Sequence, residues 1–327
     1  IVWTSGATES DNLALKGVLD VQSRDGAPAG LVTSAAEHEA VLTPAAHLRQ
    51  QGHPVQVLSP ADHGVVSPEQ VAEAINDRTA LVSVMHVNNE TGVCTDVAGI
   101  AEVCDRNDVL FHCDAVQSAG LYDIDVDALG VDLLSLSGHK FYGPKGVGAL
   151  FVRGGVELGP LVEGGSQERE RRGGTENVPG VVGLASALER AAEAAEQRVE
   201  RLSGLQRRLV NGLDDAVPGE YVLNTPIIEE ASVAPHVVNV AFPPVDGTPI
   251  DGEMLILNLD MEGVLVSAGS ACTSGALEPS HVLTALGLER ETASAAVRFS
   301  LGTDTTEEDI DYALDKLQTT LERMGPS

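Results

Sequence analysis

In the first half of the chain, short apolar segments rich in branched residues alternate with segments of helical periodicity. Ser67, Pro68 and Gln70 are a helix start signal, with Ser67 as N-cap, Pro68 at the first helical position and Gln70 completing a capping box. A further helix is predicted at about residues 97–106. Alternating strands and helices indicate an α/β domain with a mostly parallel central sheet. The predicted strands are residues 31–35, 80–87, 109–113, 131–136 and 147–152.

The second half of the chain has a different pattern and predicts a second domain. Residues 181–213 form a long Ala/Glu/Arg/Leu helical pattern that is expected to lead out of the first domain. The last predicted helix starts with the capping-box pair Thr305 and Glu308. We therefore expect a large domain over residues 1–195 and a smaller α+β domain over residues 196–327. The strand candidates of the second domain are residues 220–222, 237–242 and 296–299, and its helix candidates are residues 251–260, 279–286 and 307–323.

The charge balance limits the partners of this chain. It has 20 basic and 49 acidic residues, a formal net charge of -29, and the acids are spread along its length. Such a surface argues against nucleic acid or an anionic membrane as partner. With only four lysines, the composition indicates adaptation to high salt, and the alternative is ordinary acidity in a cytosolic enzyme. The first residues read as a strand entering a glycine turn, so we expect an N-terminal segment to be absent from this sequence.

The four cysteines predict a reduced protein and single out one thiol. They form no C-x-x-C pair, so their spacing supports neither a zinc site nor a disulfide framework, and a reducing cytoplasm is the expected location. Cys94, Cys104 and Cys113 are expected to be packing residues. Cys272 differs, because Ser, Gly, Ala and Thr surround it in a loop of small residues. A mobile, exposed thiol of this kind becomes a nucleophile when it is deprotonated.

A lysine-bearing turn follows the predicted strand at residues 131–136. The segment at residues 135–146, Ser-Leu-Ser-Gly-His-Lys-Phe-Tyr-Gly-Pro-Lys-Gly, places Lys140 among small and polar residues. Lysine, unlike arginine, loses its proton when it is desolvated or lies near other cations. The chemistry that most needs such an amine is a Schiff base with pyridoxal phosphate. The alternative for the motif by itself is a surface lysine in a loop.

The strand ends of the first domain also carry polar residues that match a pyridoxal phosphate site. Such a site needs a phosphate cradle, an acid at the pyridine nitrogen, a ring-stacking group, a donor to the phenolic oxygen and a carboxylate clamp. Each candidate has a structural alternative, namely a helix cap, a satisfied histidine, a turn former or an exposed arginine. The candidates are Thr8 and Thr175 for the phosphate, His38 for stacking or proton transfer, Asn88 and Asn89 for a ligand hydrogen bond, Asp114 for the pyridine nitrogen, Gln117 for the phenolic oxygen and Arg298 for a carboxylate.

Eight motifs in one order make the chain resemble the cysteine desulfurases of the class V aminotransferase-like family. They lie at residues 4–10, 37–38, 86–92, 114–118, 137–146, 172–175, 269–272 and 297–302. The resemblance is to the housekeeping group with a long, mobile cysteine loop, and it implies the pyridoxal-phosphate-dependent transferase fold of type I. It implies these roles: Lys140 as Schiff-base lysine; Asp114 at the pyridine nitrogen; His38 as ring stacker and acid/base; Gln117 near the phenolic oxygen; Ala7, Thr8, Ser137 and His139 at the phosphate, with Thr175 from a second subunit; Asn89 and Arg298 at the substrate carboxylate, Asn89 also near the cofactor; and Cys272 as sulfur acceptor.

The resemblance implies conversion of L-cysteine to L-alanine, with the sulfur held on Cys272 as a persulfide. Acceptors would be an iron–sulfur scaffold protein or a tRNA thiolation enzyme, and the family implies a homodimer. Two departures are visible: the family's usual opening is missing, and Val116 stands where threonine is commoner. The alternatives are a selenocysteine lyase or another class V enzyme, and a non-catalytic assembly scaffold. Cys272 argues against an aminotransferase, because transamination needs no thiol.

Overall fold

The computed structural model describes residues 1–23, 27–61, 64–217, 219–228, 232–268 and 278–324, and it separates the chain into two compact units. Unit 1 comprises Ile1–Ala61, Val65–Val87 and Thr95–Glu196. Unit 2 comprises Asp62–Gly64, Asn88–Cys94 and Gln197–Ser327. Within the described residues, no helix has the length and apolar character needed to cross a bilayer.

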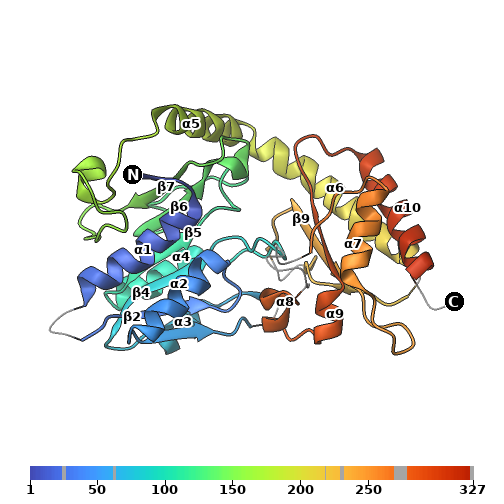
Figure 1. Cartoon of the computed structure of the whole chain (residues 1–327), viewed down its shortest axis with the longest axis horizontal. Helices are drawn as coiled ribbons and strands as arrows, with labels where there is room; N and C mark the ends of the chain where they lie inside the picture. Colours follow the sequence, from blue (N-terminus) through green and yellow to red (C-terminus); the bar gives the residue numbers. More distant parts are fainter. Residues whose placement is uncertain (24–26, 62–63, 218, 229–231, 269–277, 325–327) are drawn as a thin grey trace. The chain divides into compact units, whose positions relative to one another are not determined.

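Unit 1 is built on a seven-stranded sheet of order β1-β7-β6-β5-β4-β2-β3 (Figure 1). Neighbouring strands from β3 through β6 pair in parallel, whereas β7 is antiparallel to both β6 and β1. The predicted α/β architecture with a mostly parallel sheet is thereby confirmed. The strands are β1 (Val2–Thr4), β2 (Gly30–Ser34), β3 (Val55–Leu58), β4 (Thr79–Met85), β5 (Leu110–Asp114), β6 (Leu133–Ser137) and β7 (Gly148–Val152).

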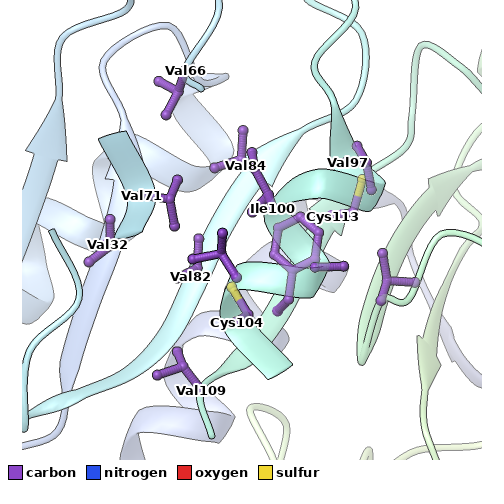
Figure 2. Close-up of a cluster of buried hydrophobic side chains, with 14 of the residues drawn as sticks. Val32, Val66, Val71, Val82, Val84, Val97, Ile100, Cys104, Val109 and Cys113 are labelled. Atoms are coloured by element: carbon purple, nitrogen blue, oxygen red, sulfur yellow. The ribbon is translucent and has the colours of Figure 1, made fainter. Parts of the chain in front are cut away.

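Helices cover both faces of this sheet, as parallel sheets require. Helices α1 and α2 bury leucines against one face, including Leu13, Leu15 and Leu48. Helices α3 and α4 cover the other face, where valines of β2 and β4 meet Ile100 and Cys104 of α4 (Figure 2). The helices are α1 (Ala7–Gln22), α2 (Glu39–Gln50), α3 (Pro68–Ala74), α4 (Val97–Arg106) and α5 (Val178–Glu193), with short 3-10 turns η2 (Gly138–Phe141) and η3 (Gln167–Glu170).

Unit 2 holds a three-stranded antiparallel sheet of order β10-β9-β8 together with helices. Its central strand β9 is fully buried, and the side chain of Gln206 in α6 donates to the backbone carbonyls of Ala234 and Val237. The elements are β8 (Val222–Leu223), β9 (Val237–Ala241), β10 (Ala296–Ser300), α6 (Ala195–Ala216, in unit 2 from Gln197 on), α7 (Gly252–Met261), α8 (His281–Ala285), α9 (Arg290–Ser294) and α10 (Glu307–Met324).

Of the two predicted capping boxes, one is confirmed and the other is displaced by one residue. The capping box of Ser67 and Gln70 is present as predicted. The one predicted at Thr305 and Glu308 is wrong by one residue: Thr306 and Asp309 exchange the hydrogen bonds, at 2.9 and 3.2 Å. The Thr305 hydroxyl instead accepts a hydrogen bond from the Gly302 backbone at 2.9 Å. The sequence allows two capping boxes, Thr305 with Glu308 or Thr306 with Asp309. Because the Thr305 hydroxyl is used in the turn with Gly302, the box forms between Thr306 and Asp309.

The long helix predicted over residues 181–213 is two helices. Helix α5 ends at Glu193 and α6 begins at Ala195, with Ala194 between them at φ -99° and ψ 3°. The residues around the break are good helix formers, so helical periodicity alone gives no sign of it.

Candidate functional site

The candidate site of unit 1 lies at one edge of the large sheet. Strands β1, β2, β4, β5 and β6 run in the same direction, because β1 and β6 both pair antiparallel with β7. Their carboxyl ends therefore share an edge, where ligands bind in open α/β sheets. Asp114 ends β5, Ser137 ends β6, and the first turn of α1 follows β1. Asp114 and Ser137 stand at the strand ends where the sequence predicts polar residues.

Lys140 sits in the short turn η2, which follows β6 directly. The Gly138 backbone donates to Val147 O at 3.0 Å, and the Gly143 backbone donates to Gly138 O at 2.9 Å. A β-carbon on Gly143 would lie 2.7 Å from that carbonyl oxygen, so the tight turn requires glycine there. The Lys140 side chain is exposed. Its positive charge partly opposes the burial that raises the pKa of Asp114. The turn thus places Lys140 at the sheet edge where the buried Asp114 ends the neighbouring strand β5.

Asp114 is the acid that the sequence predicts at a buried strand end. It is 7% exposed, and its Oδ1 accepts a hydrogen bond from the Val116 backbone at 2.9 Å. Burial raises the pKa of Asp114 to about 6, although the Val116 amide and the Lys140 ammonium oppose the change. A buried carboxylate of this kind is stabilised by a cation or a protonated ring nitrogen.

Behind Asp114 lies a buried polar row that sequence reasoning missed. His112 Nδ1 is hydrogen-bonded to Ser83 Oγ at 2.8 Å, and His112 Nε2 to Ser135 Oγ at 2.9 Å. Thr33 Oγ1 extends the row by donating to Ser83 O at 2.8 Å. Burial lowers the pKa of His112 to about 3, so this histidine is neutral.

Two further carboxyls of unit 1 are completely enclosed beside this row. Asp11 Oδ1 lies 3.6 Å from His112 Nε2, and Glu37 Oε1 accepts from the Met85 backbone at 3.0 Å. Burial first, and then the negative charge of Asp114, raise the pKa of both carboxyls well above the usual range.

The start of α1 has the donors of a phosphate cradle. Its N-cap, Gly6, supplies no capping side chain. Free amides at a helix N-terminus favour an anion. The half-buried Ala7 and exposed Thr8 begin the helix, and Ser137 Oγ is hydrogen-bonded to His139 Nδ1 at 3.0 Å. A β-carbon on Gly148 would lie 2.7 Å from Gly6 Cα, so glycine permits β7 to approach this turn.

The other unit 1 candidates lie around this edge. His38 is exposed and caps α2, with Nδ1 accepting from the Ala40 backbone at 3.0 Å, so a neutral His38 carries its proton on Nε2. Gln117 is half-buried in the turn after Asp114. Thr175 is exposed in the segment before α5. The structural alternative of a helix cap thus applies to His38.

Arg298 and Asn89 belong to unit 2, where they contact each other. Arg298 Nη1 donates to Asn89 O at 2.9 Å, and its Nε donates to Ser267 Oγ at 3.2 Å. Burial lowers the pKa of Arg298, with Glu90 opposing that effect. Asn89 Oδ1 is buried and has no hydrogen bond to any residue that the structure describes. The Arg298 guanidinium can donate to a ligand carboxylate, and the Asn89 Oδ1 atom can accept a hydrogen bond from a ligand.

The cysteines are expected to be packing residues except for Cys272, the predicted nucleophile, which lies outside the described residues. Cys104 and Cys113 are buried and Cys94 is half-buried, as expected.

These residues fit pyridoxal phosphate as a donor set. Unit 1 offers an uncapped helix start with hydroxyl and imidazole groups for a phosphate, a buried carboxyl for a ring nitrogen and an amine within electrostatic reach of it.

The buried Asp114 leads to a pH prediction for the cofactor-free chain. Its folded pKa of about 6 lies above the ordinary value of 3.8, so between these values the folded chain holds a proton that the unfolded chain has lost. Its contribution to stability is complete below about pH 4 and is lost as pH rises to about 6. The loss is at most about 3 kcal/mol. We expect Asp114→Asn to gain stability relative to the parent over this range, measured by urea unfolding at each pH. A constant difference between the two chains would show that Asp114 titrates normally.

The mostly parallel sheet of unit 1, with β7 antiparallel to its two neighbours, agrees with the pyridoxal-phosphate-dependent transferase fold of type I, to which the following relatives also point. A family model described as aminotransferase class-V matches residues 1–313. The chain is 45% identical over 317 residues to the cysteine desulfurase IscS of Clostridium botulinum, covering 97% of this chain and 78% of that protein. It is 44% identical over 326 residues to the cysteine desulfurase IscS of Escherichia coli, covering 99% and 77%.

Solved structures agree with these relatives. A NifS-like protein, 36% identical, superposes with a TM-score of 0.87 over 98% of this chain and 82% of its own. DndA from Streptomyces lividans, 39% identical, superposes with a TM-score of 0.75 over 91% and 82%. The chain belongs to the class V aminotransferase family and, within it, to the cysteine desulfurases, a pyridoxal-phosphate-dependent group.

Proposed function

We propose that this chain binds pyridoxal phosphate at the sheet edge of unit 1 and uses it to convert L-cysteine to L-alanine. The observation that carries this proposal is that Asp114 ends β5 and the Lys140 turn follows the neighbouring parallel strand β6, so the buried acid and the amine lie at the same edge of the sheet. An amine and an acid in that relation are the two protein groups on which pyridoxal chemistry most depends. The family membership supports the same reaction.

Each residue then has a defined task. Lys140 would hold the cofactor through its amine and would move a proton at the substrate α-carbon. Asp114, when ionised, would keep a proton on the pyridine nitrogen, and Gln117 would donate to the phenolic oxygen. Bound pyridoxal phosphate supplies an electron sink for the bonds at the substrate α-carbon.

Further residues would orient the cofactor and the substrate. His38 would stack on the ring and exchange protons through Nε2. Ala7, Thr8, Ser137 and His139 hold the phosphate, with Thr175 from a second subunit. Asn89 and Arg298 bind the substrate carboxylate, for which the planar guanidinium is suited.

The sulfur step rests on Cys272. Its thiolate attacks the substrate sulfur, the carbon–sulfur bond breaks, and the carbon keeps the bonding electron pair and takes a proton to give alanine. Cys272 retains the sulfur as a persulfide, which passes to an acceptor such as an iron–sulfur scaffold protein or a tRNA thiolation enzyme. We further propose a homodimer, a cytoplasmic location and adaptation to high salt, the last supported by the net charge of -29.

The test is release of sulfide and alanine from L-cysteine by the purified chain with pyridoxal phosphate and a reductant, in low and high salt. We expect both products in equal amounts, with more turnover in high salt. A coloured, cofactor-loaded protein that releases neither product would contradict the proposal. A large preference for selenocysteine over cysteine would reassign the chain to selenium chemistry.

A further inference from the structure

A half-buried ion pair joins the first turn of α1 to the segment that carries Thr175. Arg172 Nε donates to Glu9 Oε1 at 2.9 Å and Arg172 Nη2 to Glu9 Oε2 at 3.4 Å. The Glu9 side chain is 12% exposed and the Arg172 side chain 24%. Glu9 Oε2 also accepts from the Ser5 backbone at 2.8 Å, which fixes the turn that enters the helix. One carboxylate therefore orders two backbone segments beside the same helix end.

The position of Glu9 creates an electrostatic problem for a phosphate site. Glu9 is the third residue of α1, so its carboxylate lies in the turn whose amides are the proposed phosphate donors. Although burial alone would raise the pKa of Glu9, hydrogen bonds from Arg172 and Ser5 lower it below the usual range, so Glu9 is ionised. An ionised carboxylate in that turn repels a phosphate dianion unless a cation neutralises it, because partial burial strengthens charge interactions.

The guanidinium of Arg172 is committed to this neutralisation. Its Nε and Nη2 atoms bind Glu9, and its Nη1 donates to Gly173 O at 3.2 Å. Room beside this contact is limited, since a β-carbon on Gly174 would lie 3.3 Å from Nη1. Arg172 is therefore oriented by Glu9 and by its own neighbour in sequence.

We propose that Glu9 and Arg172 are a positioning pair of the phosphate cradle, in which Arg172 cancels the Glu9 charge so that the α1 N-terminus accepts the cofactor phosphate. This inference rests on the proposed function. It differs from a direct role for Arg172, in which the guanidinium itself binds the phosphate. When both side chains are removed, the positioning role predicts that cofactor affinity is restored, whereas the direct role predicts that it stays weak.

The test is a double-mutant cycle of cofactor affinity with Arg172→Met, Glu9→Gln and the double variant. Each cofactor-free protein is titrated with pyridoxal 5'-phosphate and with pyridoxal, which lacks the phosphate. Binding is followed by visible absorbance and by quenching of the single tryptophan, Trp3 in β1. We expect Arg172→Met to weaken pyridoxal 5'-phosphate binding at least about tenfold, because an unpaired carboxylate remains. Glu9→Gln and the double variant should stay within about threefold of the parent, and pyridoxal affinity should change little in all variants.

The outcomes separate the possible explanations. A double variant as weak as Arg172→Met would mean that Arg172 binds the phosphate directly and would overturn the inference, as would equal losses for pyridoxal. If Arg172→Met does not fold, Glu9→Gln still decides, since a loss above about tenfold contradicts a charge-cancelling role. Asp127→Asn is the matched control, because Asp127 pairs with Arg153 at 2.8 Å just after β7, at the opposite edge of the sheet. If the unmutated chain binds no pyridoxal 5'-phosphate, the proposed function fails rather than the pair.

Discussion

Replacing Lys140 with alanine is expected to reduce sulfide release at least about a thousandfold, because the change removes both the covalent anchor of the cofactor and its proton carrier. The structure gives a reason why no other lysine substitutes. Lys140 follows β6 directly in a turn closed by the Gly138 and Gly143 hydrogen bonds, and its charge acts on Asp114. Steady-state assays measure the loss, and the visible spectrum should change because the lysine link is absent.

Lys145 provides the control for this experiment. It is exposed in the same connection between β6 and β7. Lys145→Ala should therefore retain activity within about threefold of the parent, since an exposed surface charge contributes little. Comparable losses in the two variants would mean that the whole turn, rather than the Lys140 amine, was disturbed. Full activity in Lys140→Ala would refute the assignment.

Replacing Cys272 with alanine is expected to abolish sulfur transfer while the protein stays coloured. The cofactor groups proposed in unit 1 do not include this thiol, so pyridoxal phosphate should bind with unchanged affinity. Without a thiolate to attack the substrate sulfur, alanine and sulfide formation from L-cysteine should both fall to background. Product assays and the visible spectrum of the same sample test both parts of this expectation.

Cys94→Ala is the matched control for the thiol. Cys94 is half-buried in unit 2, and its Sγ lies 3.8 Å from the Gly92 carbonyl oxygen. It should keep at least half of the parent's turnover, because a packing cysteine tolerates alanine with a modest loss of stability. Normal sulfide release by Cys272→Ala would refute the persulfide step.

The sequence predicts the frame of unit 1 well, because the determinants are local. Strand–helix alternation, the Ser67 capping box and the helix at 97–106 depend on residues close in sequence, and the structure has each of them. The polar strand ends at Asp114 and Ser137 are likewise readable, since parallel strands share one carboxyl edge.

The sequence does not predict the buried hydrogen-bonded row around His112, because that row depends on the register between strands that are distant in sequence. His112, Ser83 and Ser135 meet because β4, β5 and β6 align Ser83 with His112 and Asp114 with Ser135. The sequence does carry a signal for this row. On each of the three strands a leucine that packs in the same core cluster as α1 (Leu81, Leu110 and Leu133) is followed two residues later, on the same face, by a polar residue. A polar residue at an inward position of a buried strand predicts a partner, but only the fold says which.

The antiparallel direction of β7 restricts how the Lys140 turn can vary in length. A parallel successor to β6 would require a crossover, whereas β7 returns along β6 with paired residues from Leu133 and Val152 to Ser137 and Gly148. The connection at residues 138–147 is therefore held at both ends by the same ladder. An inserted residue there would displace the amine relative to Asp114 or unpair the ladder, so related chains should differ in the composition of this turn rather than in its length.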